Sequence, residues 1–194
     1  MSKSDYLVLP DRIFVTGIGT GVGKTIASAA LCKLYGYDYW KPIQSGDLDH
    51  SDSDHVRILA PHTTIHPEQY RLNHPMSPHA SAALDGIKIR MNDFIIPDVE
   101  KLCVEGAGGI LVPISEDETM LDLIKIFFFP VALIIRDYLG CINHSLMSRE
   151  VLKLNNIPIA AVVYNGNFTP TTLSYLQTKF QDIPAIYLPE LADN

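Results

Sequence analysis

A glycine-rich loop near the start of the 194-residue sequence carries its plainest chemical signal. Between an apolar run and an Ala/Leu-rich segment lies Gly17-Ile18-Gly19-Thr20-Gly21-Val22-Gly23-Lys24-Thr25. Glycines let backbone N–H groups turn towards phosphate oxygens, and a following helix N-terminus adds partial positive charge. Lys24 would reach the terminal phosphates, and the Thr25 hydroxyl would bind Mg²⁺. The loop is one residue longer than the usual pattern, and a turn without a ligand is the alternative, but the flanking segments favour a phosphate site.

Three other polar residues lie where predicted strands or loops could bring them to the same ligand. Lys41 ends the expected strand 37–41, Glu105 ends the expected strand 102–105, and Asp54 lies in an acidic loop. Ligands of open parallel sheets bind beyond the carboxyl ends of strands, and Mg²⁺ beside a nucleotide takes few protein oxygens. The alternatives stay open: a strand-capping lysine, a salt-bridged glutamate, and a solvated aspartate among several others.

The histidines and cysteines do not indicate a metal centre. Six of the seven histidines fall between His50 and His79, without helical i, i+4 spacing or a cysteine partner, so we expect a polar surface loop there. The three cysteines, Cys32, Cys103 and Cys141, are odd in number and widely spaced, which is typical of reduced thiols in a cytosolic protein. Cys141 could be a reactive thiol, but nothing in the sequence lowers its pKa.

Alternating strands and helices must position these residues. Apolar, near-continuous strands that alternate with helices predict an α/β fold: a single-domain, doubly wound, mainly parallel sheet with helices on both faces, of P-loop NTPase type, over residues 1–194. The expected strands are 12–16, 37–41, 102–105, 131–136, 159–164 and 185–188, the expected helices are 24–35, 79–84, 119–126, 142–155 and 171–180, with a short helix ending at Leu59 and a weak one near Met91, and segments 44–54 and 61–78 are expected to be irregular.

The composition narrows the classes of partner. Apolar residues make up 47% and charged residues 19%, with a formal net charge of −7. An acidic chain argues against binding nucleic acid or an anionic membrane through a basic face. The longest apolar run, 126–135, is too short for a membrane span, and residues 1–10 show no secretory signal. We therefore expect a cytoplasmic protein with small-molecule partners.

Several motifs together resemble the dethiobiotin synthetase family. Their order and approximate spacing run through nearly the whole chain, and only the glycine-rich loop is generic. The matching stretches are Phe14-Val15-Thr16-Gly17 with Gly23-Lys24-Thr25, Lys41-Pro42-Ile43-Gln44-Ser45-Gly46, Ser53-Asp54, Ser77-Pro78-His79, Val104-Glu105-Gly106-Ala107-Gly108-Gly109 and Leu139-Gly140-Cys141-Ile142-Asn143-His144.

The resemblance implies an ATP- and Mg²⁺-dependent cyclo-ligase of biotin biosynthesis. Such an enzyme joins CO₂ to 7,8-diaminopelargonate through a carbamate and a carbamic-phosphoric anhydride, and the second amine then displaces phosphate. It also implies a homodimer in which the neighbouring subunit supplies part of the substrate site. The protein's part is positioning and charge neutralisation.

The same resemblance implies a role for each matching residue. Lys41 and Lys24 would be catalytic, and Thr25, Asp54 and Glu105 would surround Mg²⁺. Ser45 would contact the diamine. Gly140, Cys141, Ile142 and Asn143 would meet the substrate carboxylate, and the nucleotide would contact Thr20, Gly21, Val22, Gly23, Lys24, Thr25, Ile26, Asp54, Glu105, Gly106, Ala107, Gly108, Asn165, Pro189 and Glu190.

The sequence departs from the dethiobiotin synthetase pattern at two places, and three other families are less compatible with it. Gly21 stands where some members have Glu, and the sequence stops at Asn194 where longer members continue beside the base. A partitioning-ATPase switch would need a further lysine where Gly19 stands. A cobyrinate amide synthase would need an additional glutamine-hydrolysing domain, and another small-molecule kinase remains the third alternative.

Overall fold

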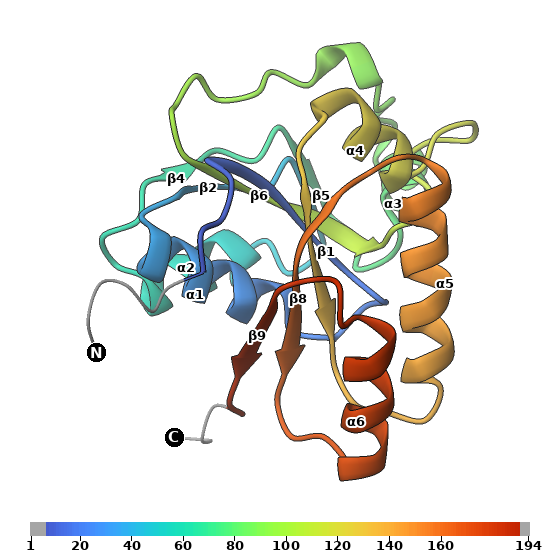
Figure 1. Cartoon of the computed structure of the whole chain (residues 1–194). Helices are drawn as coiled ribbons and strands as arrows, with labels where there is room; N and C mark the ends of the chain where they lie inside the picture. Colours follow the sequence, from blue (N-terminus) through green and yellow to red (C-terminus); the bar gives the residue numbers. More distant parts are fainter. Residues whose placement is uncertain (1–6, 191–194) are drawn as a thin grey trace.

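A seven-stranded sheet in the order β4-β2-β6-β1-β7-β8-β9 forms the centre of the computed structural model, which describes residues 7–190 (Figure 1). All strand pairs recorded in this sheet are parallel, which confirms the predicted α/β class. The strands are β1 (Arg12–Gly17), β2 (Asp38–Trp40), β3 (Ile43–Ser45), β4 (Ile65–His66), β5 (Tyr70–Leu72), β6 (Leu102–Gly109), β7 (Val131–Ile135), β8 (Ile159–Asn165) and β9 (Ala185–Leu188).

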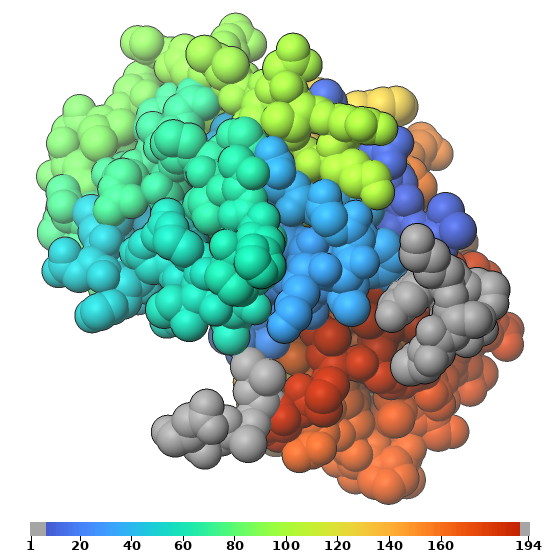
Figure 2. Space-filling view, turned by 90° about the vertical axis from the view of Figure 1, so that its left-hand side faces the viewer, coloured from blue at the N-terminus to red at the C-terminus, as the bar shows by residue number. Residues whose placement is uncertain are grey.

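The helices lie on both sides of this sheet. Figure 1 shows α1 and α2 on one side and α4, α5 and α6 on the other, as in a doubly wound fold. In Figure 2 the teal and green segments and the orange and red segments fill opposite halves of one face. The helices are α1 (Lys24–Tyr35), α2 (Asp52–Leu59), α3 (Pro78–Asp85), α4 (Met120–Phe127), α5 (Cys141–Leu154) and α6 (Pro170–Lys179), with a 3-10 turn, η1 (Met91–Asp93).

The core is built from strands that are apolar along their whole length. Every residue of β7 is fully buried, because helices cover both faces of a central parallel strand. Trp40 stacks on Phe127 with ring centroids 5.6 Å apart, which ties β2 to α4. Within residues 7–190, no helix combines the length and apolar character needed to cross a membrane.

The predicted loop 44–54 is the main error in the expected elements. It contains most of β3, which pairs with β5 in a separate two-stranded sheet, and the first turn of α2. Segment 61–78, also expected to be irregular, contains the short strands β4 and β5. The helix starts early because Ser51 and Asp54 form a capping box, in which each side chain bonds the backbone N–H of the other residue. The pattern Ser-x-x-Asp was visible in the sequence. Strand β6 is also longer than expected and continues through the glycines to Gly109.

Gly46 joins β3 to the loop before α2 at a position that only glycine suits. Its φ of 72° lies in the left-handed region, and a Cβ there would lie 2.5 Å from Cα of Pro75. The close approach brings segment 75–78 beside Ser45. Gly36 shares the left-handed conformation, with φ of 71°, but no atom would lie within 4 Å of its Cβ.

These two glycines give a matched pair for a stability test. Gly36→Ala is expected to lower the free energy of unfolding by about 1 kcal/mol, the conformational cost alone. Gly46→Ala is expected to cost about 3 kcal/mol, because displacement of Pro75 adds to that cost. Urea denaturation measures both values. An equal loss of unfolding free energy in the two variants would show that the close approach of Pro75 to Gly46 adds nothing to the cost of a side chain there.

Candidate active site

A cavity of about 710 Å³ opens at the carboxyl ends of β1, β2 and β6. The glycine-rich loop, the residue after β2, the first turn of α2 and the end of β6 form its walls. The residues of these walls include Thr20, Gly21, Gly23, Lys24, Thr25, Ile26, Lys41, Gln44, Ser45, Asp52, Ser77, Pro78, Glu105, Ala107 and Gly108.

A cluster of charged side chains lies at the bottom of this cavity. The Lys41 ammonium nitrogen is 2.5 Å from Oδ2 of Asp52 and 3.2 Å from Oε1 of Glu105. The Thr25 hydroxyl is 2.7 Å from Oδ1 of Asp52 and 3.0 Å from the same Glu105 oxygen. The hydroxyl of buried Tyr39 donates to the other Glu105 oxygen at 3.0 Å. Both carboxylates are thus fixed on one lysine and one threonine.

Mutual attraction offsets the effect of burial on the pKa values of Lys41 and Asp52. Burial acts to lower the pKa of Lys41, but the Glu105 and Asp52 carboxylates outweigh it and raise that pKa above its usual value. Burial acts to raise the pKa of Asp52, but Lys41 outweighs it and lowers that pKa. Burial lowers the pKa of Lys24, which has no such close partner.

The glycine-rich loop has the geometry of a phosphate cradle. Gly23, with φ of 84°, is the N-cap of α1, so the helix N-terminus points into the cavity beside Lys24 and Thr25. The Lys24 ammonium donates to the Gly19 carbonyl at 3.2 Å, and so curls back over the loop. Below the loop, the Asn165 amide donates to the Val22 carbonyl at 3.0 Å.

The structure corrects the prediction that Asp54 faces the metal position. Its carboxylate accepts bonds from the backbone N–H and hydroxyl of Ser51, at 3.1 and 2.8 Å, and pairs with Arg57 at 2.5 Å. The bonds to Ser51 lower the pKa of Asp54. Because residues two apart on a helix point in nearly opposite directions, the capping box that turns Asp54 outward turns Asp52 into the cavity.

The remaining predicted residues are placed at varying distances from this cavity. Ser45 lines it, and its hydroxyl oxygen is buried without a hydrogen-bond partner. Val22 and Gly106 are buried behind the walls. Of the residues predicted near the base, Asn165 contacts the loop from below, whereas Pro189 and Glu190 are exposed and outside the cavity lining.

The predicted substrate-carboxylate segment, Gly140, Cys141, Ile142 and Asn143, begins α5 and is not among the cavity residues. Leu139 beside it is fully exposed. Cys141 is buried and free, like the other two cysteines, and burial raises its pKa, so it does not form a reactive thiolate. The segment therefore does not line the cavity of its own chain.

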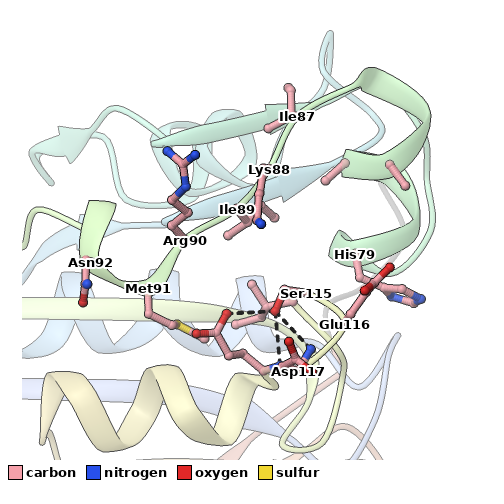
Figure 3. A pocket seen from close by; sticks show the side chains of 14 residues that line it. His79, Ile87, Lys88, Ile89, Arg90, Met91, Asn92, Ser115, Glu116 and Asp117 are labelled. Atoms are coloured by element: carbon pink, nitrogen blue, oxygen red, sulfur yellow. Dashed lines mark hydrogen bonds between the residues drawn. The ribbon is translucent and has the colours of Figure 1, made fainter.

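A second cavity of about 670 Å³ lies behind α3 and has a different character (Figure 3). Figure 3 shows Lys88 and Arg90 on one side and Glu116 and Asp117 on the other. All four are exposed. This cavity has neither a glycine-rich loop nor a buried charge, so the chemistry points to the first one.

The donors of the first cavity suit Mg²⁺ better than a soft metal. Its cation-facing atoms are two carboxylates and a hydroxyl, the hard oxygens that Mg²⁺ prefers alongside phosphate and water. In the part of the chain that the structure describes, no three His, Cys, Asp or Glu residues gather into a metal-binding group.

Comparisons with known proteins agree with this geometry. A family model described as an AAA domain matches residues 11–188. The ATP-dependent dethiobiotin synthetase BioD of Christiangramia forsetii is 45% identical over 167 residues, 84% of this chain and 80% of that protein. The protein of the same name from Novosphingobium aromaticivorans is 47% identical over 155 residues, 79% of this chain and 75% of that protein.

A solved structure supports the fold alone. A plasmid partition protein from Borrelia burgdorferi B31, bound to AMPPNP, aligns with a TM-score of 0.56 at 11% identity and covers 96% of this chain and 88% of its own. The fold is thus of P-loop NTPase type. The sequence relatives decide the family: the chain belongs to the ATP-dependent dethiobiotin synthetases and is an ATP-dependent cyclo-ligase.

Proposed function

We propose that this chain closes the ureido ring of dethiobiotin from 7,8-diaminopelargonate, CO₂ and ATP, with Mg²⁺, through a carbamate and a carbamic-phosphoric anhydride. One observation carries the proposal: Lys41 and Lys24, two buried ammonium groups, line one cavity with the Asp52 and Glu105 carboxylates. A nucleotide site alone would need only the loop lysine. A second buried lysine suits a second anion, which a carbamate supplies.

The reaction has three balanced steps. One amine of the substrate adds to CO₂ and loses a proton, which gives a carbamate. A carbamate oxygen then attacks the γ-phosphorus of ATP, and ADP leaves. The second amine attacks the carbonyl carbon and loses a proton, the carbon–oxygen bond to phosphate breaks, and the ring closes with release of phosphate.

The residues bind and orient these groups. The backbone of the loop and Lys24 hold the phosphates, and Lys41 neutralises the carbamate and the phosphoryl group in transfer. The unpartnered hydroxyl of Ser45 offers a hydrogen-bond partner to the diamine. When bound, Mg²⁺ would neutralise phosphate charge, held by Thr25, Asp52 and Glu105.

The function and the role of Lys41 are tested in one assay. Wild-type protein incubated with ATP, Mg²⁺, bicarbonate and diaminopelargonate is expected to form a product of the mass of dethiobiotin, with phosphate released in equal amount. Lys41→Gln is expected to reduce product formation about 100-fold, or about 3 kcal/mol of transition-state stabilisation. Binding of Mg²⁺ with a non-hydrolysable ATP analogue, measured by calorimetry, should be no weaker, because the loop is intact. Normal turnover of Lys41→Gln would contradict its role, and no wild-type product would contradict the function.

The assignment of Asp52, instead of Asp54, as a metal ligand gives a second prediction. Asp52→Ala is expected to weaken the apparent affinity for Mg²⁺ about tenfold or more in turnover assays, because it removes a carboxylate from the cavity. Asp54→Ala is the control on the same helix: its turnover should stay within about threefold of wild type, because the Ser51 hydroxyl still accepts from the backbone N–H of residue 54 and keeps the start of the helix. Loss of the bonds to the Asp54 carboxylate should lower the free energy of unfolding by about 1 kcal/mol. If Asp54→Ala weakened the affinity for Mg²⁺ and Asp52→Ala did not, Asp54 would be the metal ligand.

A homodimer with the substrate site between subunits completes the proposal. The segment that begins α5 lies outside the chain's own cavity, and its helix N-terminus suits the carboxylate of a substrate bound to a neighbouring subunit. The exposed Leu139 beside it supports burial against a partner. The net charge of −7 supports small-molecule partners over nucleic acid and membranes. We place the enzyme in the cytoplasm and treat residues 1–194 as one domain.

Subunit complementation tests the shared site. Asn143→Glu is expected to abolish activity, because its charge repels the substrate carboxylate, whereas an acidic residue near a helix N-terminus is compatible with folding. Co-expressed with Lys41→Gln, it should regain about a quarter of wild-type activity, because half of the dimers are mixed and each mixed dimer keeps one intact site. If both residues served the same subunit's site, mixing would restore nothing.

A further inference from the structure

Lys41 occupies the point where the oxygen donors of the cavity converge. Its ammonium nitrogen is 2.5 Å from Asp52 and 3.2 Å from Glu105. The Thr25 hydroxyl bonds to the same two carboxylates at 2.7 and 3.0 Å. These three residues are the donors assigned above to Mg²⁺. The ammonium group is therefore in contact with both of the carboxylates that a divalent cation would need.

Burial strengthens the attraction between Glu105 and a cation at this point. The side chains of Lys41 and Glu105 are only 5% and 1% exposed, so water screens this pair little, whereas the Asp52 side chain is 31% exposed. Across residues 7–190, Lys41 is the cation that forms ion pairs with Asp52 and Glu105, whereas Lys24 donates to the Gly19 carbonyl. Without a positive charge between them, the two neighbouring carboxylates would repel each other.

We propose that Lys41 is an internal substitute for the divalent cation, which holds the empty metal site together and leaves it when the cation binds. The proposal rests on the proposed function for the metal and for the carbamate. An ammonium group and a divalent cation repel each other strongly at contact distance in a buried site, so they cannot share the carboxylates. Lys41 would then be free for the substrate only in the metal-loaded enzyme, which couples metal binding to substrate activation.

The test is Mn²⁺ affinity without nucleotide, measured by electron paramagnetic resonance, since Mn²⁺ takes the same oxygen ligands. Lys41→Met is expected to bind Mn²⁺ about tenfold or more tightly than wild type, because the competing cation is gone. In EDTA the variant should melt at a lower temperature than wild type, and Mn²⁺ should raise its melting temperature by more.

Two controls distinguish the ion pairs of Lys41 from the general effect of removing a positive charge. Lys24→Met removes one nearby positive charge without an ion pair to either carboxylate, so the Mn²⁺ affinity should tighten by less than about threefold. Arg57→Gln breaks an ion pair of the same 2.5 Å length on the exposed side of α2 and should change nothing. Equal tightening in Lys24→Met, or unchanged or weaker Mn²⁺ binding in Lys41→Met, overturns the proposal.

A measurement on wild-type protein covers the case in which Lys41→Met does not fold. Crystal structures in EDTA and with Mg²⁺ and a non-hydrolysable ATP analogue are expected to differ in the Lys41–Asp52 pair, present in the first and broken in the second. A bound ion beside an intact pair would overturn the proposal. Tighter Mn²⁺ binding in a protein that makes no dethiobiotin would instead reject only the proposed function.

Discussion

Charge balance between Lys41, Asp52 and Glu105 constrains much of the rest of the structure. A buried carboxylate is tolerated only when paired, so the strands that deliver these residues must be in register. Strand β6 pairs Val104 with Trp40, the last residue of β2, and the next residues in the sequence are Glu105 and Lys41. On its other side β6 pairs Glu105 with Val15 of β1, just before the glycine-rich loop. This register therefore brings the glycine-rich loop, Glu105 and Lys41 together.

The position of Asp52, the third member of the cluster, depends on the residue at which α2 begins. Asp52 is the first residue of α2, and the capping box fixes where that helix begins. A start one residue later would rotate the helix by about a quarter of a turn and move Asp52 away from Lys41. Ser51 and Asp54 therefore act on the site through geometry alone, although neither lines the cavity.

Local patterns in the sequence were enough for most of the fold but not for the details of the site. Helix α1 and its end at Gly36, the buried β7 and the loop lysine follow from periodicity and spacing, and Lys41 and Glu105 follow from the rule that parallel strands end at one edge. The errors fall where short elements compete with acidic loop composition, as in segment 44–54. The bonds Tyr39–Glu105 and Asn165–Val22 join residues 66 and 143 positions apart, and no local pattern predicts them.

The division of the site between segments explains how a common fold supports a particular reaction. The phosphate loop comes from β1 and α1, and a partition protein with 11% identity has the same fold. Lys41 and the unpartnered hydroxyl of Ser45 come instead from the segment between β2 and α2, whereas Asp52 begins α2 and Glu105 lies on β6. Because these residues follow different strands, their chemistry can change while the phosphate cradle is kept. In the proposed function, the lysine that follows β2, rather than the loop lysine, distinguishes a carboxyl-activating enzyme from a nucleotide switch.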